Sequence, residues 1–247
     1  MTGPARDLQA IAVTLIVAAA TAGHCTPSHA AGAAYQVDTA EVSSVGSCKV
    51  ESWVSSASNR DFIAATSPAC VVNLFRPVEV SSQFTRSRAD DEWTSAAQPK
   101  LKTNLIPSAI GSWGVALSAT VAYDFTAREI TTLSVTVPAT LRLSEVVRIN
   151  VNAGWQFDRT VSQHYFAYGL GVDWRTPDNV WTLTAEVFGL LGTAEDASTV
   201  QPRFQTGIRY RPVDEFNIDL IYGRNITGEN AHWITLATIF RFSLKDK

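Results

Sequence analysis

Apolar and polar residues alternate along most of this chain after about residue 41, with the period of two that is typical of β-strands. In residues 146–158, VVRINVNAGWQFD, the odd positions from Val147 to Phe157 are apolar or aromatic and the even positions are mostly polar. Residues 113–124 and 164–174 repeat this alternation, with small residues on the second face. The pattern predicts strands with two different faces.

Residues 180–191, VWTLTAEVFGLL, are ambiguous when taken alone. Val180, Leu183 and Val187 fit one face of a helix, but the same stretch also alternates as a strand. Because the neighbouring segments favour strands, we expect a strand here too, with Glu186 on its polar face.

The alternation predicts about twelve strands joined by tight connections, since polar and proline-bearing breaks separate the segments. Breaks that are mostly short and proline-bearing take turns with breaks that are mostly longer and polar or charged, as expected for up-and-down hairpins. The expected strands are 45–54, 63–75, 78–86, 98–105, 113–124, 129–141, 147–158, 164–175, 180–191, 200–211, 216–224 and 232–242.

Two architectures bury such strands: a soluble barrel or sandwich, and a membrane barrel with its apolar face outward. Aromatic residues near strand ends, such as Trp113, Tyr123 and Trp174, occupy the positions of interfacial girdles. The opposite face is small and polar, with few of the charges that a solvated sheet carries. The predicted fold is therefore an all-β, transmembrane, up-and-down antiparallel β-barrel.

The N-terminus resembles a secretory signal peptide, because Arg6 precedes an apolar run at residues 11–23 that is too short to span a membrane. Small residues follow it, and we expect cleavage near Ala31 or Ala34. The expected division is a signal peptide over residues 1–33 and a barrel domain over residues 34–247. Export and an even strand count favour the outer membrane of a Gram-negative cell, with both termini on one side.

The last strand ends in an aromatic residue, Phe242, followed by a short polar tail. A terminal aromatic residue resembles the signature by which outer-membrane barrels engage the barrel-assembly machinery, although the tail makes the match imperfect. The expected partners are therefore that machinery, outer-membrane lipid and a small-molecule solute.

Charge and composition exclude several other functions. The net charge of −3 gives no basic stripe for nucleic acid. Only His164 and His232 remain after the signal and neither has close ligand partners, so we expect no metal site and no cofactor. His164 has serines near it, but no nucleophile-elbow motif surrounds them, so we do not expect an enzyme.

Charged residues on the polar face are the candidate site, because a barrel turns that face to its lumen. Glu186 is expected to face Arg203 or Arg209, and Asp219 to face Arg209 or Arg211. These charges form either a constriction that selects solutes or an ion-pair network that closes a narrow barrel. The candidates are Lys100, Lys102, Arg148, Glu186, Arg203, Arg209, Asp219 and Arg224.

Cys48 and Cys70 flank the first expected hairpin at similar distances from its turn. The register puts both residues on the same face of adjacent strands, and disulfides persist in exported proteins. A cross-strand disulfide and a pair of free thiols both remain open.

The C-terminal part of the chain resembles a family of proteobacterial outer-membrane barrels named for a MetA pathway of phenol degradation, which are also labelled porin-like transporters. The segments GIRYRP, DLIYGRNITGE and WITLATIFRF carry the resemblance, and NVNAGWQFD and AEVFG are consistent with it. The N-terminal third, with the cysteine pair, has no counterpart in the resemblance. The family implies export or uptake near aromatic catabolism and supplies no site residues.

The function expected from these observations is a passive channel or transporter for small solutes, aromatic or other small organic compounds among them. Two alternatives are a structural or accessory barrel without conductance and a soluble, β-rich periplasmic binding protein.

Overall fold

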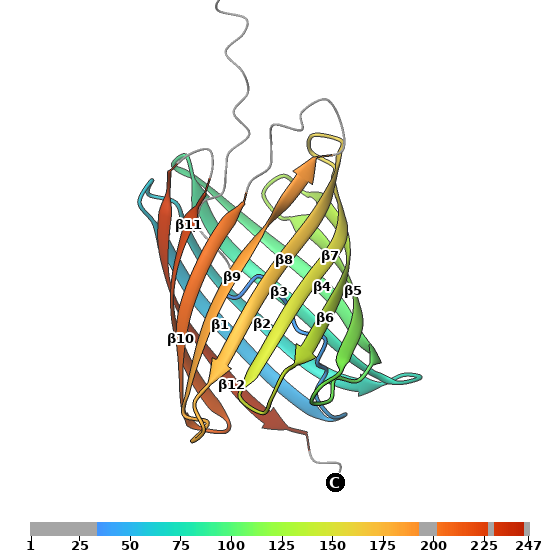
Figure 1. Cartoon of the computed structure of the whole chain (residues 1–247). Helices are drawn as coiled ribbons and strands as arrows, with labels where there is room; N and C mark the ends of the chain where they lie inside the picture. Colours follow the sequence, from blue (N-terminus) through green and yellow to red (C-terminus); the bar gives the residue numbers. More distant parts are fainter. Residues whose placement is uncertain (1–33, 193–201, 227–229, 245–247) are drawn as a thin grey trace, which may run out of the picture.

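The computed structural model describes residues 34–192, 202–226 and 230–244, and in them the chain forms one closed barrel of twelve antiparallel strands (Figure 1). The strands are β1 (Ser47–Ala57), β2 (Phe62–Asn73), β3 (Pro77–Ala89), β4 (Glu92–Ile106), β5 (Trp113–Asp124), β6 (Glu129–Arg142), β7 (Val147–Asp158), β8 (Gln163–Arg175), β9 (Trp181–Gly192), β10 (Arg203–Val213), β11 (Phe216–Asn225) and β12 (His232–Ser243). The predicted all-β barrel is confirmed, including its strand count.

The barrel closes because the first and last strands pair along their whole length, from Ser47 with Ser243 to Ala57 with Trp233. Every other strand pairs only with its neighbours in sequence, as the up-and-down prediction requires. Closure gives each strand two partners, so no sheet edge is left with unpaired backbone groups. β1 begins and β12 ends at the same end of the barrel, here called the terminal end (Figure 1).

Large apolar side chains point outward. Trp113, Leu117, Leu170 and Leu220 are exposed, whereas small or polar inward neighbours such as Ala116 are buried. A water-soluble protein rarely exposes so continuous an apolar surface. The outer face therefore belongs in a bilayer and the lumen is polar, as the alternation predicts. Among the described residues, no helix is long and apolar enough to cross a membrane, an observation that does not bear on crossing by strands.

The hairpin of β3 and β4 extends further than expected, and the predicted loop over residues 87–95 is wrong. Strand pairing continues to Ala89 and resumes at Glu92, around a turn in which Asp90 and Asp91 have positive φ. Hydroxyl side chains support this extension, since Ser87 Oγ lies 2.8 Å from Thr94 Oγ1. Polar pairs of this kind lie outside the apolar alternation on which the prediction rested. The resulting two-residue turn also weakens the expected contrast in loop length between the two ends.

Cys48 and Cys70 face each other across β1 and β2 and form a disulfide, with their Cα atoms 4.1 Å apart. They lie near the terminal end, on the outward face of the two strands. The choice that the sequence left open is resolved in favour of the bond.

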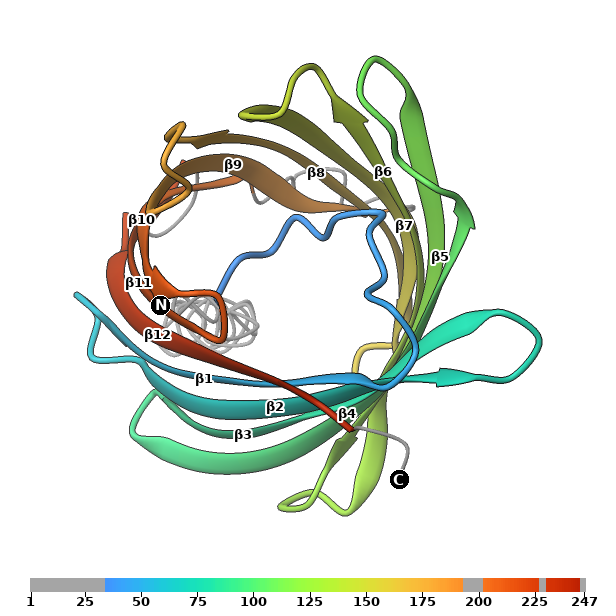
Figure 2. The ribbon, with the colours of Figure 1, turned by 90° about the horizontal axis from the view of Figure 1, so that it is seen from below.

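The described residues that precede β1 lie inside the barrel. Figure 2, viewed along the barrel from the terminal end, shows them running inside the ring of strands. We call residues 34–46 the luminal segment. The predicted signal peptide at residues 1–33 lies outside the described residues and remains a prediction.

Candidate functional site

The luminal segment enters the barrel at the terminal end and reaches well into the interior. Near its C-terminal end, where β1 begins, Ser44 O accepts a hydrogen bond from Ser47 N at 3.1 Å. At its N-terminal end, inside the barrel, Ala34 is buried against Trp53, Ala65 and Ala237, which point inward from β1, β2 and β12. The segment therefore lines and narrows the lumen over a substantial part of its length.

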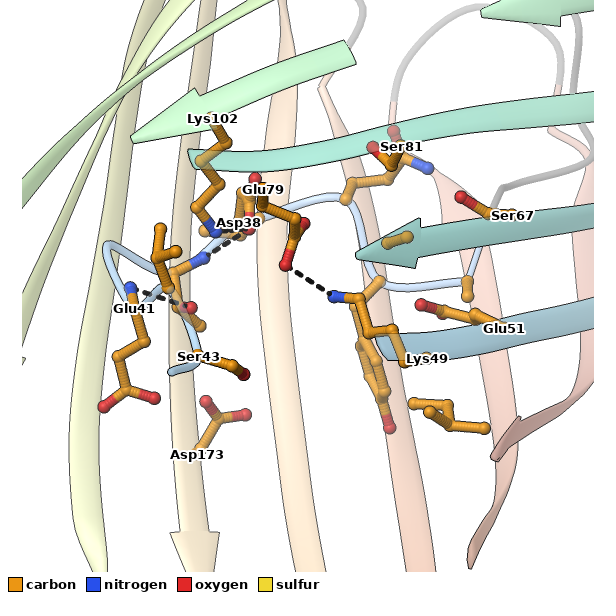
Figure 3. A pocket seen from close by; sticks show the side chains of 18 of the residues that line it. Asp38, Glu41, Ser43, Lys49, Glu51, Ser67, Glu79, Ser81, Lys102 and Asp173 are labelled. Atoms are coloured by element: carbon orange, nitrogen blue, oxygen red, sulfur yellow. Dashed lines mark hydrogen bonds and ion pairs between the residues drawn. The ribbon is translucent and has the colours of Figure 1, made fainter. Parts of the chain in front are cut away.

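Asp38 anchors the segment to the wall through two lysines of β4. Its carboxylate oxygens lie 2.5 Å from Lys100 Nζ and 2.7 Å from Lys102 Nζ, and Figure 3 shows the Lys102 side chain pointing at Asp38. The Lys102 side chain is only 4% exposed. Burial would raise the pKa of Asp38, but the two ammonium groups outweigh it and hold the pKa well below its usual range.

Glu41 makes a second anchor on a neighbouring part of the wall, at β6 and β7. Its carboxylate accepts a hydrogen bond from Arg148 Nη1 at 2.9 Å, and Arg142 Nε lies 4.0 Å away. Arg148 Nε also donates to Asp173 at 2.6 Å, and Asp173 in turn accepts from Thr184 at 2.6 Å. One arginine thus joins the segment to a hydrogen-bonded group on β7, β8 and β9.

Glu186 faces the lumen, but it pairs with amides and not with an arginine. Its carboxylate accepts hydrogen bonds from Gln205 Nε2 at 2.8 Å and from the backbone N–H of Gln36 at 3.0 Å. The expected pairing with Arg203 or Arg209 is wrong, because the strand register puts Gln205 directly opposite Glu186. A buried carboxylate is thereby satisfied by β10 and the luminal segment together.

The second expected ion pair is present. Arg209 Nε and Nη2 donate to the two carboxylate oxygens of Asp219 at 2.6 and 2.9 Å, and Asp219 is fully buried. The guanidinium carbon of Arg209 also lies 5.4 Å from the ring centroid of Tyr35, within the range of a cation–π contact. Burial raises the pKa of Tyr35, so the phenol stays protonated.

Backbone groups of the segment find partners on the wall. Ala40 N donates to Thr140 Oγ1 at 2.8 Å, and Ala40 O accepts from Asn104 Nδ2 at 2.5 Å. Gln205 Nε2 donates to Ala34 O at 3.0 Å. An extended chain without a partner strand needs such side-chain partners to be buried without cost.

Glycines on β8 and β10 make room for the segment. A Cβ atom added at Gly207 would lie 2.5 Å from the Tyr35 hydroxyl, and one added at Gly169 would lie 2.9 Å from Val37 Cγ2. Val37 itself packs into a buried apolar cluster with Phe188 and Trp233. The inward small residues therefore accommodate the chain and do not simply widen the lumen.

A polar cavity of about 1450 Å³ remains beside the segment. Turn residues of the terminal end, such as Arg76 and Ser144, line one part of it. Thr132 and Gln156, near the far ends of β6 and β7, line another, so the cavity extends along most of the barrel. On its wall Lys49 Nζ of β1 lies 3.4 Å from Glu79 Oε2 of β3 (Figure 3).

The structure places most predicted site residues in the lumen, on the strand face that turns inward. These are Lys100, Lys102, Arg148, Glu186, Arg203, Arg209 and Asp219. Their role as a constriction stays a prediction.

The lumen assignment of Arg224 is wrong. Inward positions on β11 are odd-numbered, as with Asp219, so Arg224 shares the outer face with Leu220 and Tyr222. Its Nε donates to Asn230 Oδ1 at 3.0 Å, in the connection to β12. Arg224 and Asp219 are an odd number of residues apart, and successive side chains of a strand alternate between its two faces, so the two side chains point to opposite faces.

The sequence interpretation missed Tyr35, Asp38 and Glu41. The available signal was the inward lysine pair at Lys100 and Lys102, since the acid directly opposite Lys102 in the register, Glu79, pairs with Lys49 instead. Within residues 34–192, 202–226 and 230–244, no group of three or more His, Cys, Asp or Glu side chains is arranged to hold a metal ion.

A family described as "Uncharacterised conserved protein UCP029691" matches this chain over residues 16–242. None of the curated proteins matches the sequence. The narrower resemblance to the phenol-degradation barrels is not shown by this match.

Solved barrels share the fold at low sequence identity. A KdgM porin in complex with disordered oligogalacturonate is 7% identical with a TM-score of 0.61, over 78% of this chain and 99% of that chain. An outer membrane channel from Pseudomonas putida F1 is 13% identical with a TM-score of 0.59, over 84% of this chain and all of the other. Outer membrane phospholipase A from Escherichia coli is 10% identical with a TM-score of 0.51, over 77% and 89%.

At these identities the likeness shows the fold, which is that of Gram-negative outer-membrane barrels. Together with the apolar outer face, it confirms the predicted location in the outer membrane. The neighbours include channels and one enzyme, so the chemistry of the chain has to be argued from its own lumen.

Proposed function

The chain belongs to the family of uncharacterised conserved proteins UCP029691, and we propose that it is a passive outer-membrane channel for small polar solutes. The observation that carries the proposal is the polar cavity that extends along the barrel beside the luminal segment. The segment acts as a fixed part of the wall, which narrows the route and sets its size limit.

The lining points to solutes that are polar and carry little net charge. Most wall charges are matched in pairs, as with Lys49 and Glu79 or Arg148 and Asp173. Between these pairs the cavity presents neutral hydroxyl and amide groups, among them Gln83 and Gln98. A solute that offers donors and acceptors replaces its lost hydration there, whereas a bare ion meets both signs of charge.

Aromatic or other small organic compounds, which the sequence resemblance implies, come within the proposal when they carry polar groups. The cavity has few aromatic lining residues, chiefly Tyr35, Trp53 and Phe75. A purely apolar ring would gain little from such a surface.

The main competing function is a structural barrel without conductance. The anchors at Asp38 and Glu41 favour it, because two ion-paired contacts hold the luminal segment across the lumen. The third alternative, a soluble periplasmic binding protein, is opposed by the apolar outer face.

Liposome swelling tests the proposal with solutes of increasing size. Proteoliposomes holding the barrel should swell in small neutral sugars and amino acids, and the rate should fall steeply as the solute grows. Absence of swelling with every solute, from a barrel that shows the heat-dependent gel shift of a folded one, would favour the structural role.

A further inference from the structure

A groove interrupts the apolar outer face where β12, β1, β2 and β3 lie side by side. It has a volume of about 560 Å³ and is lined mainly by apolar surface. Figure 2 shows these four strands as neighbours on one side of the barrel. The groove lies on the membrane side of the wall and is separate from the lumen.

Small outward side chains form the floor of this groove. Ser52 lies opposite Thr66, and Ala64 lies opposite Val54, where the rest of the face carries large apolar residues. Ser52 Oγ and Thr66 Oγ1 are 3.1 Å apart and bond to each other, so the floor leaves these hydroxyls satisfied. The walls are formed by exposed apolar side chains, among them Phe84 and Leu236.

A cationic and aromatic cluster stands at the end of the groove. Arg86, which lines the groove, lies opposite Ala64 on β2, and Arg88 follows on the same outward face of β3. Their guanidinium carbons lie 5.0 and 5.7 Å from the ring centroid of Trp93. Phe62 packs edge-on against that ring, with centroids 6.1 Å apart.

The two guanidinium groups are held by neutral partners. Arg86 Nη1 donates to Ser95 Oγ at 2.8 Å, and Arg88 Nη2 donates to the carbonyl oxygen of Arg60 at 2.9 Å. In the described part of the chain no ion pair joins either arginine to a carboxylate, although Asp90 and Asp91 stand in the turn beyond them. Both arginines thus keep their charge uncompensated.

The depth of the cluster follows from strand length. A tilted spanning strand needs ~9–11 residues, so a crossing that begins at Pro77 ends near Arg86 and Arg88. This end lies opposite the terminal end. With the start of β1 and the end of β12 on the periplasmic side, as expected for this architecture, the cluster lies in the interface of the outer leaflet.

We propose that the groove and the cluster form a binding site for a phosphorylated lipid of the outer leaflet. One acyl chain lies in the groove over Ser52, Ala64 and Thr66. The phosphate group of the same lipid is bound by Arg86 and Arg88. Guanidinium groups bind phosphate through paired, charge-assisted hydrogen bonds, and tryptophan is favoured at the membrane interface. The site does not depend on conductance through the lumen.

The test uses the full-length barrel in detergent, with diphosphoryl lipid A as the probe and native mass spectrometry as the readout. Arg86→Gln combined with Arg88→Gln should weaken binding by at least about tenfold, which corresponds to roughly 1.4 kcal/mol. Ala64→Leu should also weaken it, because the added side chain occupies the groove without changing charge. It places an apolar residue on a lipid face, so insertion is retained.

Arg224→Gln is the matched control, since Arg224 also lies outward near the end of the barrel away from the termini. It should bind lipid A as the unmodified protein does. Fully dephosphorylated lipid A should bind more weakly than the diphosphoryl form. If the double arginine variant and Ala64→Leu both bind lipid A as tightly as the unmodified protein does, the proposed site is overturned. Equal binding of the phosphorylated and dephosphorylated lipids would overturn the role assigned to the arginines.

Discussion

Asp38 is the side chain on which the position of the luminal segment depends most directly. It joins the segment to Lys100 and Lys102, and its removal would leave a nearly buried ammonium group without a partner. Breaking a fully buried ion pair costs ~3–5 kcal/mol. The cost here is smaller, because the Asp38 side chain keeps 28% of its surface exposed to the water of the lumen.

Asp38→Asn should therefore loosen the segment and raise both the mean conductance and its fluctuation. Single-channel recording in planar bilayers measures this change. Asp178→Asn is the control, since Asp178 lies in the exposed β8–β9 turn and touches no part of the segment. Identical traces from both variants and the unmodified protein would contradict the anchoring role.

The ion pairs of Asp38 also predict a pH dependence of the conductance. The pKa of Asp38 in the folded state lies below the ordinary value of ~3.9, so its stabilising contribution is complete above that pH. The contribution shrinks as the pH falls from the unfolded value through the folded one. Conductance should thus stay constant from neutral pH down to ~4 and rise only in stronger acid.

The measurement is best made in a Glu186→Gln background, because Glu186 also contacts the segment and carries its own carboxyl group. Asp38→Asn in that background should remove the acid-dependent rise. A rise between pH 6 and pH 5 that depends on Asp38 would show that its pKa is not lowered.

Glu186→Gln alone separates charge from anchoring. A glutamine oxygen can still accept from Gln36 N–H, so the segment should stay bound while one negative charge leaves the lumen. We expect conductance or ion selectivity to change modestly, with selectivity moving toward anions. Reversal potentials in a salt gradient measure it, and an unchanged trace would argue against a solute route past Glu186.

At the scale of elements, the period-two alternation was sufficient to predict all twelve strands. The alternation gave wrong predictions in segments that have no apolar face turned to lipid. Apart from Trp93, the outer end of the β3–β4 hairpin is mostly polar on both faces, so residues 87–95 looked like a loop. The luminal segment pairs with no strand and therefore has no period, although Asp38 and Glu41 both reach the wall, at β4 and at β7.

For the candidate site residues, the alternation predicted which face each side chain lies on but not which groups it contacts. Parity placed Lys100, Arg148 and Glu186 in the lumen, because alternation fixes the face of a residue. It did not give their partners, since these come from strand register and from a segment distant in sequence. Arg224 was misplaced by treating a polar residue near a strand end as inward, against the parity of its own strand.

The assignment of the outer face yields a prediction for single strands. Leu117→Arg on β5 or Val151→Arg on β7 should impair insertion by roughly 2–4 kcal/mol near the bilayer midplane. Thr120→Arg, whose side chain faces the cavity from β5, is the matched control and should insert. Folding titrations in lipid vesicles measure the difference. Normal insertion of both outward variants would reverse the assignment of the two faces.

For the whole molecule, the closed strand ring and the segment inside it form one functional unit. The barrel supplies a polar lumen, and the segment occupies the side near β8, β9 and β10 through Val37 and Gln36. What remains is the cavity beside the segment, and its width depends on the anchors at Asp38 and Glu41. Assembly through a terminal strand ending at Phe242 and removal of residues 1–33 remain predictions.

The central claim is that solutes cross the lumen beside a bound luminal segment. Single-channel conductance of the native barrel, compared with a variant lacking residues 35–44, tests it most directly. The account predicts small discrete steps from the native protein. The deletion should give steps several-fold larger and shifted toward anions, because Lys100 and Lys102 lose Asp38 and Arg148 loses one of its two acidic partners, Glu41. No steps from the native protein, or equal conductance from both forms, would contradict the account.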